Sequence, residues 1–166
     1  MSRYHFYPMT KDRALQISKW QYEYPYSLYD MDSSEDSILE LMNGEYYYAL
    51  DEHDDLIGFI CVGGSARVPG GYAAGIYTDL RKLDIGLGLK PDLTGNGRGQ
   101  EFLSEVLSFL NNQFSGREYQ LVVAAFNERA IRVYDRIGVV KETHFLSKYE
   151  EKELEFISMS YIKKNV

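Results

Sequence analysis

The sequence is poor in cysteine, since its 166 residues contain only Cys61. One cysteine excludes an internal disulfide framework and a zinc site built from cysteines. Its neighbours in "GFICVGG" favour a small core side chain, with a reactive thiol as the alternative. Long apolar runs are also missing, because no stretch approaches the roughly 20 residues that span a bilayer. The opening "MSRYHFYPMT" lacks the apolar centre of a signal peptide. We therefore expect a cytoplasmic protein with no membrane partner.

Basic residues are fewer than acidic ones: the sequence contains 18 Lys and Arg and 25 Asp and Glu, which gives a formal net charge of −7. A nucleic-acid-binding surface needs a basic patch, so we expect no nucleic-acid partner. An acidic surface suits a cationic partner, or serves solubility alone. The 45% hydrophobic content and the length indicate one globular domain over residues 1–166. The three histidines form no spacing typical of a nucleophile triad or a metal site, so neither is expected.

Hydrophobic periodicity predicts an alternation of strands and helices. Strands are expected at 3–8, 45–50, 56–63, 82–89, 119–126, 139–146 and 153–162, and helices at 10–20, 34–43, 99–113 and 127–138. The glycine-rich stretch 63–75 is expected to be a mobile loop. A helical crossover between 82–89 and 119–126 requires these two strands to pair in parallel. The ends form antiparallel hairpins, so we expect one mixed sheet with helices packed on it, an α/β (mixed α+β) fold.

Three glycines stand at alternate positions in "PDLTGNGRGQEF", directly before a predicted helix. Helix N-termini expose unpaired N–H groups and carry partial positive charge. Gly95, Gly97 and Gly99 therefore suggest a phosphate cradle, with an ordinary flexible loop as the alternative. A P-loop is excluded because no Lys-Ser or Lys-Thr follows. A dinucleotide-binding turn is excluded because residues 90–94 separate the strand from the glycines.

Two motifs make residues 83–138 resemble the GNAT superfamily of acyl-CoA-dependent N-acyltransferases. The first is the pyrophosphate loop Q/R-x-x-G-x-G/A, which reads here Thr94, Gly95, Asn96, Gly97, Arg98 and Gly99. Thr94 departs from the Gln or Arg that the family usually has there. The second is N-x-x-A-x-x-x-Y-x-x-x-G, which falls on Asn127, Ala130, Tyr134 and Gly138.

The resemblance implies a mostly antiparallel, twisted sheet of six to seven strands, with helices on both faces and a splayed parallel pair. It implies acetyl-CoA as co-substrate, with its diphosphate on residues 94–99. The pantetheine arm would lie beside the backbone of Leu87, Gly88 and Leu89, and beside Asn127 and Ala130. A twisted strand under bulky neighbours is the alternative for the strand glycines. Asn127 also suits a helix N-cap. Tyr134 would be the general acid that protonates the departing thiolate, or else a core tyrosine.

The general base and the acceptor site rest on weaker signals. Asp84 is the possible base nearest the chemistry, although strand alternation could point it away. A water chain, Glu23, Asp30 or Glu45 are the alternatives. The family's acceptor would enter against "YEYPYSLYDMD". There an aromatic wall of Tyr22, Tyr24, Tyr26 and Tyr29, with Glu23, Asp30 and Asp32 nearby, suits a cationic amine. Packing of these tyrosines over the core edge explains them equally well.

The sequence thus predicts an N-acetyltransferase that moves an acetyl group from acetyl-CoA to a primary amine of a small molecule or peptide. The amine would attack directly in a ternary complex, and the protein would be a monomer or homodimer. Three alternatives remain open: a non-catalytic acyl-CoA sensor, an enzyme for longer acyl chains, and a nucleotide-binding module of another kind.

Overall fold

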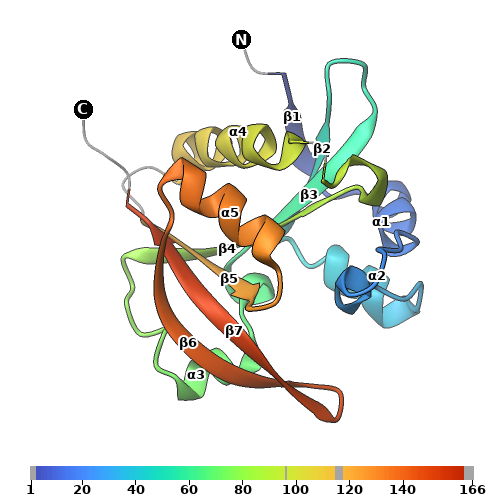
Figure 1. Cartoon of the computed structure of the whole chain (residues 1–166). Helices are drawn as coiled ribbons and strands as arrows, with labels where there is room; N and C mark the ends of the chain where they lie inside the picture. The colour runs from blue at the N-terminus through green and yellow to red at the C-terminus, as the bar shows by residue number, and fades with distance from the viewer. Residues whose placement is uncertain (1–2, 96, 115–117, 163–166) are drawn as a thin grey trace. The chain divides into compact units, whose positions relative to one another are not determined.

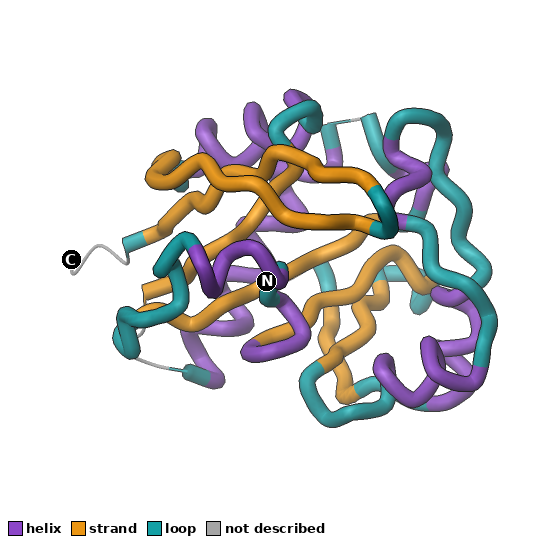
Figure 2. Tube along the Cα trace, turned by 90° about the horizontal axis from the view of Figure 1, so that it is seen from below, coloured by secondary structure: helices purple, strands orange, loops and turns teal. Residues whose placement is uncertain are grey.

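Strands and helices alternate along the computed structural model, which describes residues 3–95, 97–114 and 118–162. The strands are β1 (His5–Pro8), β2 (Tyr46–Leu50), β3 (Leu56–Val62), β4 (Lys82–Leu89), β5 (Glu118–Ala124), β6 (Val140–Tyr149) and β7 (Lys152–Tyr161). The helices are α1 (Lys11–Ser18), α2 (Glu35–Leu41), α3 (Pro69–Ala73), α4 (Arg98–Gln113) and α5 (Glu128–Ile137), with 3-10 turns η1 (Tyr26–Tyr29), η2 (Gly63–Ala66) and η3 (Pro91–Leu93). Figures 1 and 2 trace these elements.

The strands are hydrogen-bonded in the order β1-β2-β3-β4-β5-β7-β6. β1 pairs with β2, β2 with β3, β5 with β7 and β6 with β7, all antiparallel. β4 pairs with β5 in parallel, because the crossover through α4 returns the chain in the same direction. The predicted mixed, mostly antiparallel sheet of six to seven strands with one parallel pair is confirmed.

The chain folds into two compact units. The first unit holds the chain up to Cys61 together with Leu87–Glu105, and the second holds Val62–Gly86 together with the chain from Val106 onward. β4 and α4 each contribute residues to both units. A single domain over residues 1–166 stays a prediction.

The core of the first unit forms around the start of α4. Phe102 is fully buried, and its ring centroid lies 6.0 Å from that of Tyr4 and 6.2 Å from that of Phe6. β3 admits this ring because residue 58 is glycine: a Cβ there would lie 2.7 Å from the Phe102 Cζ. The helical spacing that predicted an apolar face on α4 thus corresponds to a packed core position.

The core of the second unit lies along β5. Tyr119, Leu121 and Ala124 are at most 1% exposed, and β5 pairs with β7 over its last six residues. β6 and β7 form the long orange-red hairpin of Figure 1, paired from Val140↔Ser160 to Tyr149↔Lys152 with one register shift between Lys141 and Thr143.

The predicted loop at 63–75 is wrong, because this stretch contains η2 and α3. Pro69 stands in the first turn of α3, where its fixed φ suits a helix and no N–H is needed. The two glycines after it serve close packing: a Cβ on Gly70 would lie 2.2 Å from the Leu146 carbonyl oxygen, and one on Gly71 would lie 2.5 Å from the Tyr77 ring. The Gly70 N–H also donates to the Ser147 Oγ at 2.9 Å.

Candidate active site

The glycine segment before α4 leaves an open approach to the helix N-terminus. Gly95 and Gly97 both have φ of 78°, a left-handed backbone that favours glycine. No heavy atom lies within 4 Å of the position of a Cβ on Gly97. Thr94 donates its hydroxyl to the Pro91 carbonyl at 2.7 Å, so it acts within the loop. Asn96 lies outside the described residues.

This open approach suits a phosphate group. α4 begins at Arg98 and runs for 16 residues, and the first N–H groups of such a helix have no partner within the helix. The helix dipole adds a partial positive charge at that end, which attracts anions. Binding of the coenzyme A diphosphate at Thr94, Gly95 and Gly97–Gly99 stays a prediction.

The end of β4 is packed tightly against β3. A Cβ on Gly88 would lie 2.3 Å from the Phe59 Cε1, and one on Gly58 would lie 2.7 Å from the Gly88 carbonyl oxygen. The glycine at position 88 thus makes room for the Phe59 ring, which was the alternative explanation of the strand glycines. Contacts of Leu87, Gly88 and Leu89 with a pantetheine arm stay a prediction.

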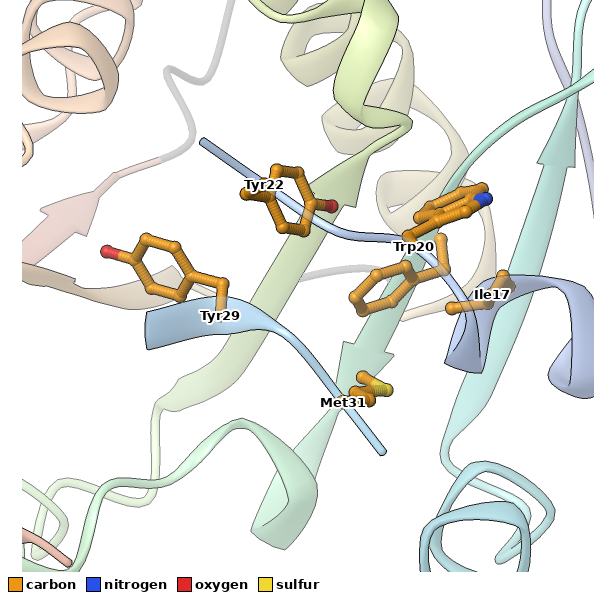
Figure 3. Close-up of a pocket in the computed structure, with 6 residues that line it drawn as sticks. Ile17, Trp20, Tyr22, Tyr29 and Met31 are labelled. Atoms are coloured by element: carbon orange, nitrogen blue, oxygen red, sulfur yellow. The ribbon is translucent and has the colours of Figure 1, made fainter. Parts of the chain in front are cut away.

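An aromatic pocket opens in the first unit beside this strand end. It is a small hollow: its space for the centre of a water-sized sphere is about 10 Å³, enough for one end of a ligand such as an ammonium group. Figure 3 shows the side chains that line it: Ile17, Trp20, Tyr22, Tyr29, Met31 and Phe59. The rings of Trp20 and Phe59 have their centroids 6.2 Å apart. The Tyr22 hydroxyl donates to the Leu89 carbonyl oxygen at 2.7 Å, so the pocket wall is joined to the end of β4.

Tyr22 keeps its phenol proton in this position. Burial raises the pKa of its phenol above the ordinary value of 10.0, and the nearby Asp30 carboxylate raises it further. The proton therefore stays on the oxygen at all physiological pH values, which keeps the hydrogen bond to Leu89 intact.

The predicted acceptor residues divide into two groups. Tyr29 lines the pocket, and an Asp30 carboxylate oxygen accepts from the Tyr22 backbone N–H at 2.7 Å. Tyr24 is 90% exposed and, like Tyr26, is not among the lining residues of this pocket. The sequence offered no signal for Phe59, which reaches the pocket from a distant strand.

In the second unit, the predicted motif residues lie on α5. The Asn127 Oδ1 accepts from the Ala130 N–H at 3.1 Å, so the predicted N-cap is confirmed. Gly138 ends the helix with φ of 99°. Tyr134 is half-buried on the last part of this helix. The contact of Asn127 and Ala130 with the cofactor, and the acid role of Tyr134, stay predictions.

A comparison of the sequence with models of protein families identifies the family of this chain. Residues 11–139 match the model of the acetyltransferase (GNAT) family. The chain belongs to the GNAT family. Its members transfer an acetyl group from acetyl-CoA to an amine, and this chain is accordingly an acyl-CoA-dependent N-acetyltransferase. No curated protein matches the sequence.

Solved structures with the same fold agree with the family. A chimeric spermidine N-acetyltransferase from Vibrio cholerae and hSSAT has a TM-score of 0.69 at 17% identity, covering 97% of this chain and 96% of that chain. A GNAT acetyltransferase from Bacillus anthracis has a TM-score of 0.69 at 12% identity, covering 96% and 95%. A dodecameric spermidine N-acetyltransferase from Vibrio cholerae has a TM-score of 0.67 at 16% identity, covering 98% and 95%. At these identities the likeness shows the fold.

The possible base of this GNAT enzyme, Asp84, is 5% exposed in the second unit. Its Oδ2 accepts from the Arg67 Nε at 2.9 Å and its Oδ1 accepts from the Gln120 Nε2 at 2.8 Å. A carboxylate whose two oxygens already accept from a cation and an amide is poorly placed to take a substrate proton. The base role of Asp84 stays a prediction that this geometry does not favour.

Membrane spans and metal sites are both missing from the described part of the chain. No helix there is both long and apolar enough to cross a bilayer. Nor do three His, Cys, Asp or Glu side chains of these residues gather as metal ligands would.

Proposed function

We propose that this enzyme acetylates a primary amine of a small cationic molecule, with acetyl-CoA held at the start of α4. The amine nitrogen attacks the thioester carbon directly in a ternary complex, and the carbon–sulfur bond breaks. A base or water chain takes the proton that the amine loses, and Tyr134 gives a proton to the departing thiolate. The α4 N-terminus with Gly95, Gly97 and Gly99 binds the diphosphate through backbone N–H groups.

One observation carries the placing of the acceptor: the Tyr22 hydroxyl donates to the Leu89 carbonyl oxygen at 2.7 Å. Leu89 belongs to the strand end that the family motif assigns to the pantetheine arm. Tyr22 belongs to the aromatic pocket, whose walls also include Trp20 and Phe59. An acceptor in this pocket would therefore lie next to the strand along which the acyl group is delivered.

The charge around the pocket supports a cationic acceptor. The first unit, which holds the pocket, is acidic overall: it contains 15 Asp and Glu and 6 Lys and Arg. Two of these cations, Lys19 and Lys90, stand next to Trp20 and Leu89 in the chain. Residues 20–61 contain no Lys or Arg and the following acids: Glu23, Asp30, Asp32, Glu35, Asp36, Glu40, Glu45, Asp51, Glu52, Asp54 and Asp55. A surface of one sign raises the local concentration of ligands of the other sign. Aromatic ring faces add a cation–π attraction for an ammonium group. Spermidine, named for several enzymes of this fold, is a molecule of this class.

The test follows coenzyme A release with amines of different charge. Spermidine and putrescine are compared with an ω-amino acid of similar length, whose net charge is zero, and with an amino acid that carries net negative charge. We expect the cationic amines to have the highest kcat/KM, and their advantage to shrink between low and high salt because charges are screened. A neutral or anionic amine that outperforms the polyamines overturns the acceptor assignment. Binding of acetyl-CoA without release in the presence of any amine favours the sensor.

The coenzyme A loop has a matched control within the chain. Gly97 and Gly44 both have positive φ, 78° and 93°, and at neither residue does a heavy atom lie within 4 Å of the place that a Cβ would occupy. Gly97→Ala and Gly44→Ala therefore carry a similar backbone strain. We expect only Gly97→Ala to weaken coenzyme A binding in calorimetry. Equal affinity in the two variants argues against diphosphate binding at this loop.

A further inference from the structure

The parallel pairing of β4 and β5 ends at one polar cluster. The register runs Lys82↔Glu118, Leu83↔Tyr119 and Asp84↔Gln120 and goes no further, although β5 continues to Ala124 and stays paired with β7. At this last pair, the side chains of Asp84 and Gln120 are hydrogen-bonded to each other at 2.8 Å. The end of the pairing thus coincides with a side-chain bridge between the two strands.

The bridge is buried and its donors are fully used. Asp84 is 5% exposed and Gln120 is 3% exposed. The Gln120 amide also donates to the Ile76 carbonyl oxygen at 2.9 Å, so its two N–H groups have two acceptors. The second Asp84 oxygen accepts from the Arg67 Nε at 2.9 Å. A buried carboxylate is stable only when it is paired in this way.

Arg67 is held in turn by two rings of the same unit. Its guanidinium carbon lies 4.8 Å from the Tyr77 ring centroid and 5.7 Å from that of Tyr72. The Tyr77 hydroxyl accepts from the Val68 N–H at 2.8 Å. Gly71 leaves room for the Tyr77 ring, since a Cβ there would lie 2.5 Å from it. The segment from Arg67 to Tyr77 is therefore built around the guanidinium that faces Asp84.

We propose that Arg67, Asp84 and Gln120 form a positioning cluster that fixes where β4 parts from β5. Asp84 stands three residues before Leu87 on the same strand, and a strand held at residue 84 leaves the sheet pairing in a defined direction. The inference rests on the proposed function, since it is the backbone at Leu87–Leu89 that is to receive the pantetheine arm. Asp84 then acts through the strand and touches neither the amine nor the thioester.

The first experiment separates a positioning residue from a base. Asp84→Asn keeps the shape of the side chain and removes its charge. We expect the Kd for coenzyme A to rise roughly 2- to 30-fold, the range seen for residues that act through a coupled element. The loss in kcat at saturating acetyl-CoA should be smaller than the loss in affinity. A fall in kcat of about 100-fold or more with an unchanged Kd is the mark of a lost general base and overturns the proposal. Unchanged values of both also overturn it.

A double variant tests whether the three residues act as a cluster. Arg67→Gln alone leaves the Asp84 charge buried without its cation, whereas Arg67→Gln with Asp84→Asn leaves a neutral polar group. We expect the double variant to bind coenzyme A more tightly than Arg67→Gln alone. Simple addition of the two single effects contradicts the cluster. The matched control is Asp79→Asn, which breaks the exposed Arg81–Asp79 pair of the same unit and should leave the affinity unchanged.

A second variant and a second measurement keep the proposal testable if Asp84→Asn does not fold or if the proposed function is wrong. If Asp84→Asn does not fold, Gln120→Met removes the cross-strand bridge, together with the hydrogen bond to the Ile76 carbonyl, and is judged by the same two outcomes. Hydrogen exchange of the ligand-free protein needs no coenzyme A: amides at Leu83–Gly86 should exchange faster in Asp84→Asn than in Asp79→Asn, and equal rates reject the cluster. If the wild-type protein binds no coenzyme A, the proposed function is wrong. The exchange rates still test the cluster in that case, because they are measured without coenzyme A.

Discussion

Replacing Gly88 by alanine should strain the wall of the aromatic pocket. The new methyl group would lie 2.3 Å from the Phe59 Cε1 and 2.6 Å from its Cζ, far inside van der Waals contact. The ring cannot simply withdraw, because its centroid lies 6.2 Å from those of both Trp20 and Tyr46. Overpacking of this kind costs about 1–3 kcal/mol of unfolding free energy. For a chain of this size that corresponds to a fall of roughly 2–12 °C in Tm.

The assay is urea and thermal unfolding followed by circular dichroism. The double variant Gly88→Ala with Phe59→Leu should recover part of the loss, because the smaller side chain gives the methyl group room. The single variant Phe59→Leu provides the baseline for that comparison. Wild-type stability of Gly88→Ala would refute the reasoning, since it would mean that the Phe59 ring does not lie against position 88.

Three other predictions follow from single side chains. Tyr134→Phe should lose turnover while acetyl-CoA still binds in calorimetry, and unchanged turnover removes Tyr134 from the mechanism. Tyr22→Phe removes the hydrogen bond to Leu89 and should lower the unfolding free energy in urea by about 0.5–1.5 kcal/mol, with a higher KM for the amine. Wild-type values of both quantities would contradict the conclusion that this hydrogen bond joins the pocket wall to the end of β4. The Lys82 ammonium, and then the Ser160 hydroxyl, hold the pKa of the Glu142 carboxyl below its ordinary value of 4.5. A lowered pKa stabilises the fold above that value, and the gain is lost as pH falls through the folded-state pKa. Glu142→Gln should therefore flatten the loss of stability below about pH 4.5 in acid titrations, and an unchanged slope would count against the pairing.

The elements with strong local signals could be predicted from the sequence. The strand at 82–89 has the predicted bounds, and α4 begins one residue earlier than expected. Thr10 accepts from the Arg13 N–H and Asn127 accepts from the Ala130 N–H, as their types at helix starts predicted. Such features depend on neighbours in the chain, so pattern and spacing are enough to find them.

The rest depended on contacts between distant residues. α3 forms in a glycine-rich stretch because Gly70 packs against Leu146, which no local pattern records. The loop tyrosines have no periodicity, so nothing in the sequence distinguished Tyr22, which lines the pocket, from Tyr24, which is 90% exposed. Strand alternation alone left the direction of Asp84 open. Its partner Arg67 comes from a stretch that the sequence presented as a loop.

Trp20 is the chain's one tryptophan, and it stands in the wall of the aromatic pocket. The protein thus carries an intrinsic optical reporter at the place where the amine is proposed to bind. Indole emission responds to the polarity of its surroundings, so titration with an unreactive diamine could be read directly from the unlabelled protein. Occupancy of the pocket could then be measured without turnover, and in the absence of any thioester.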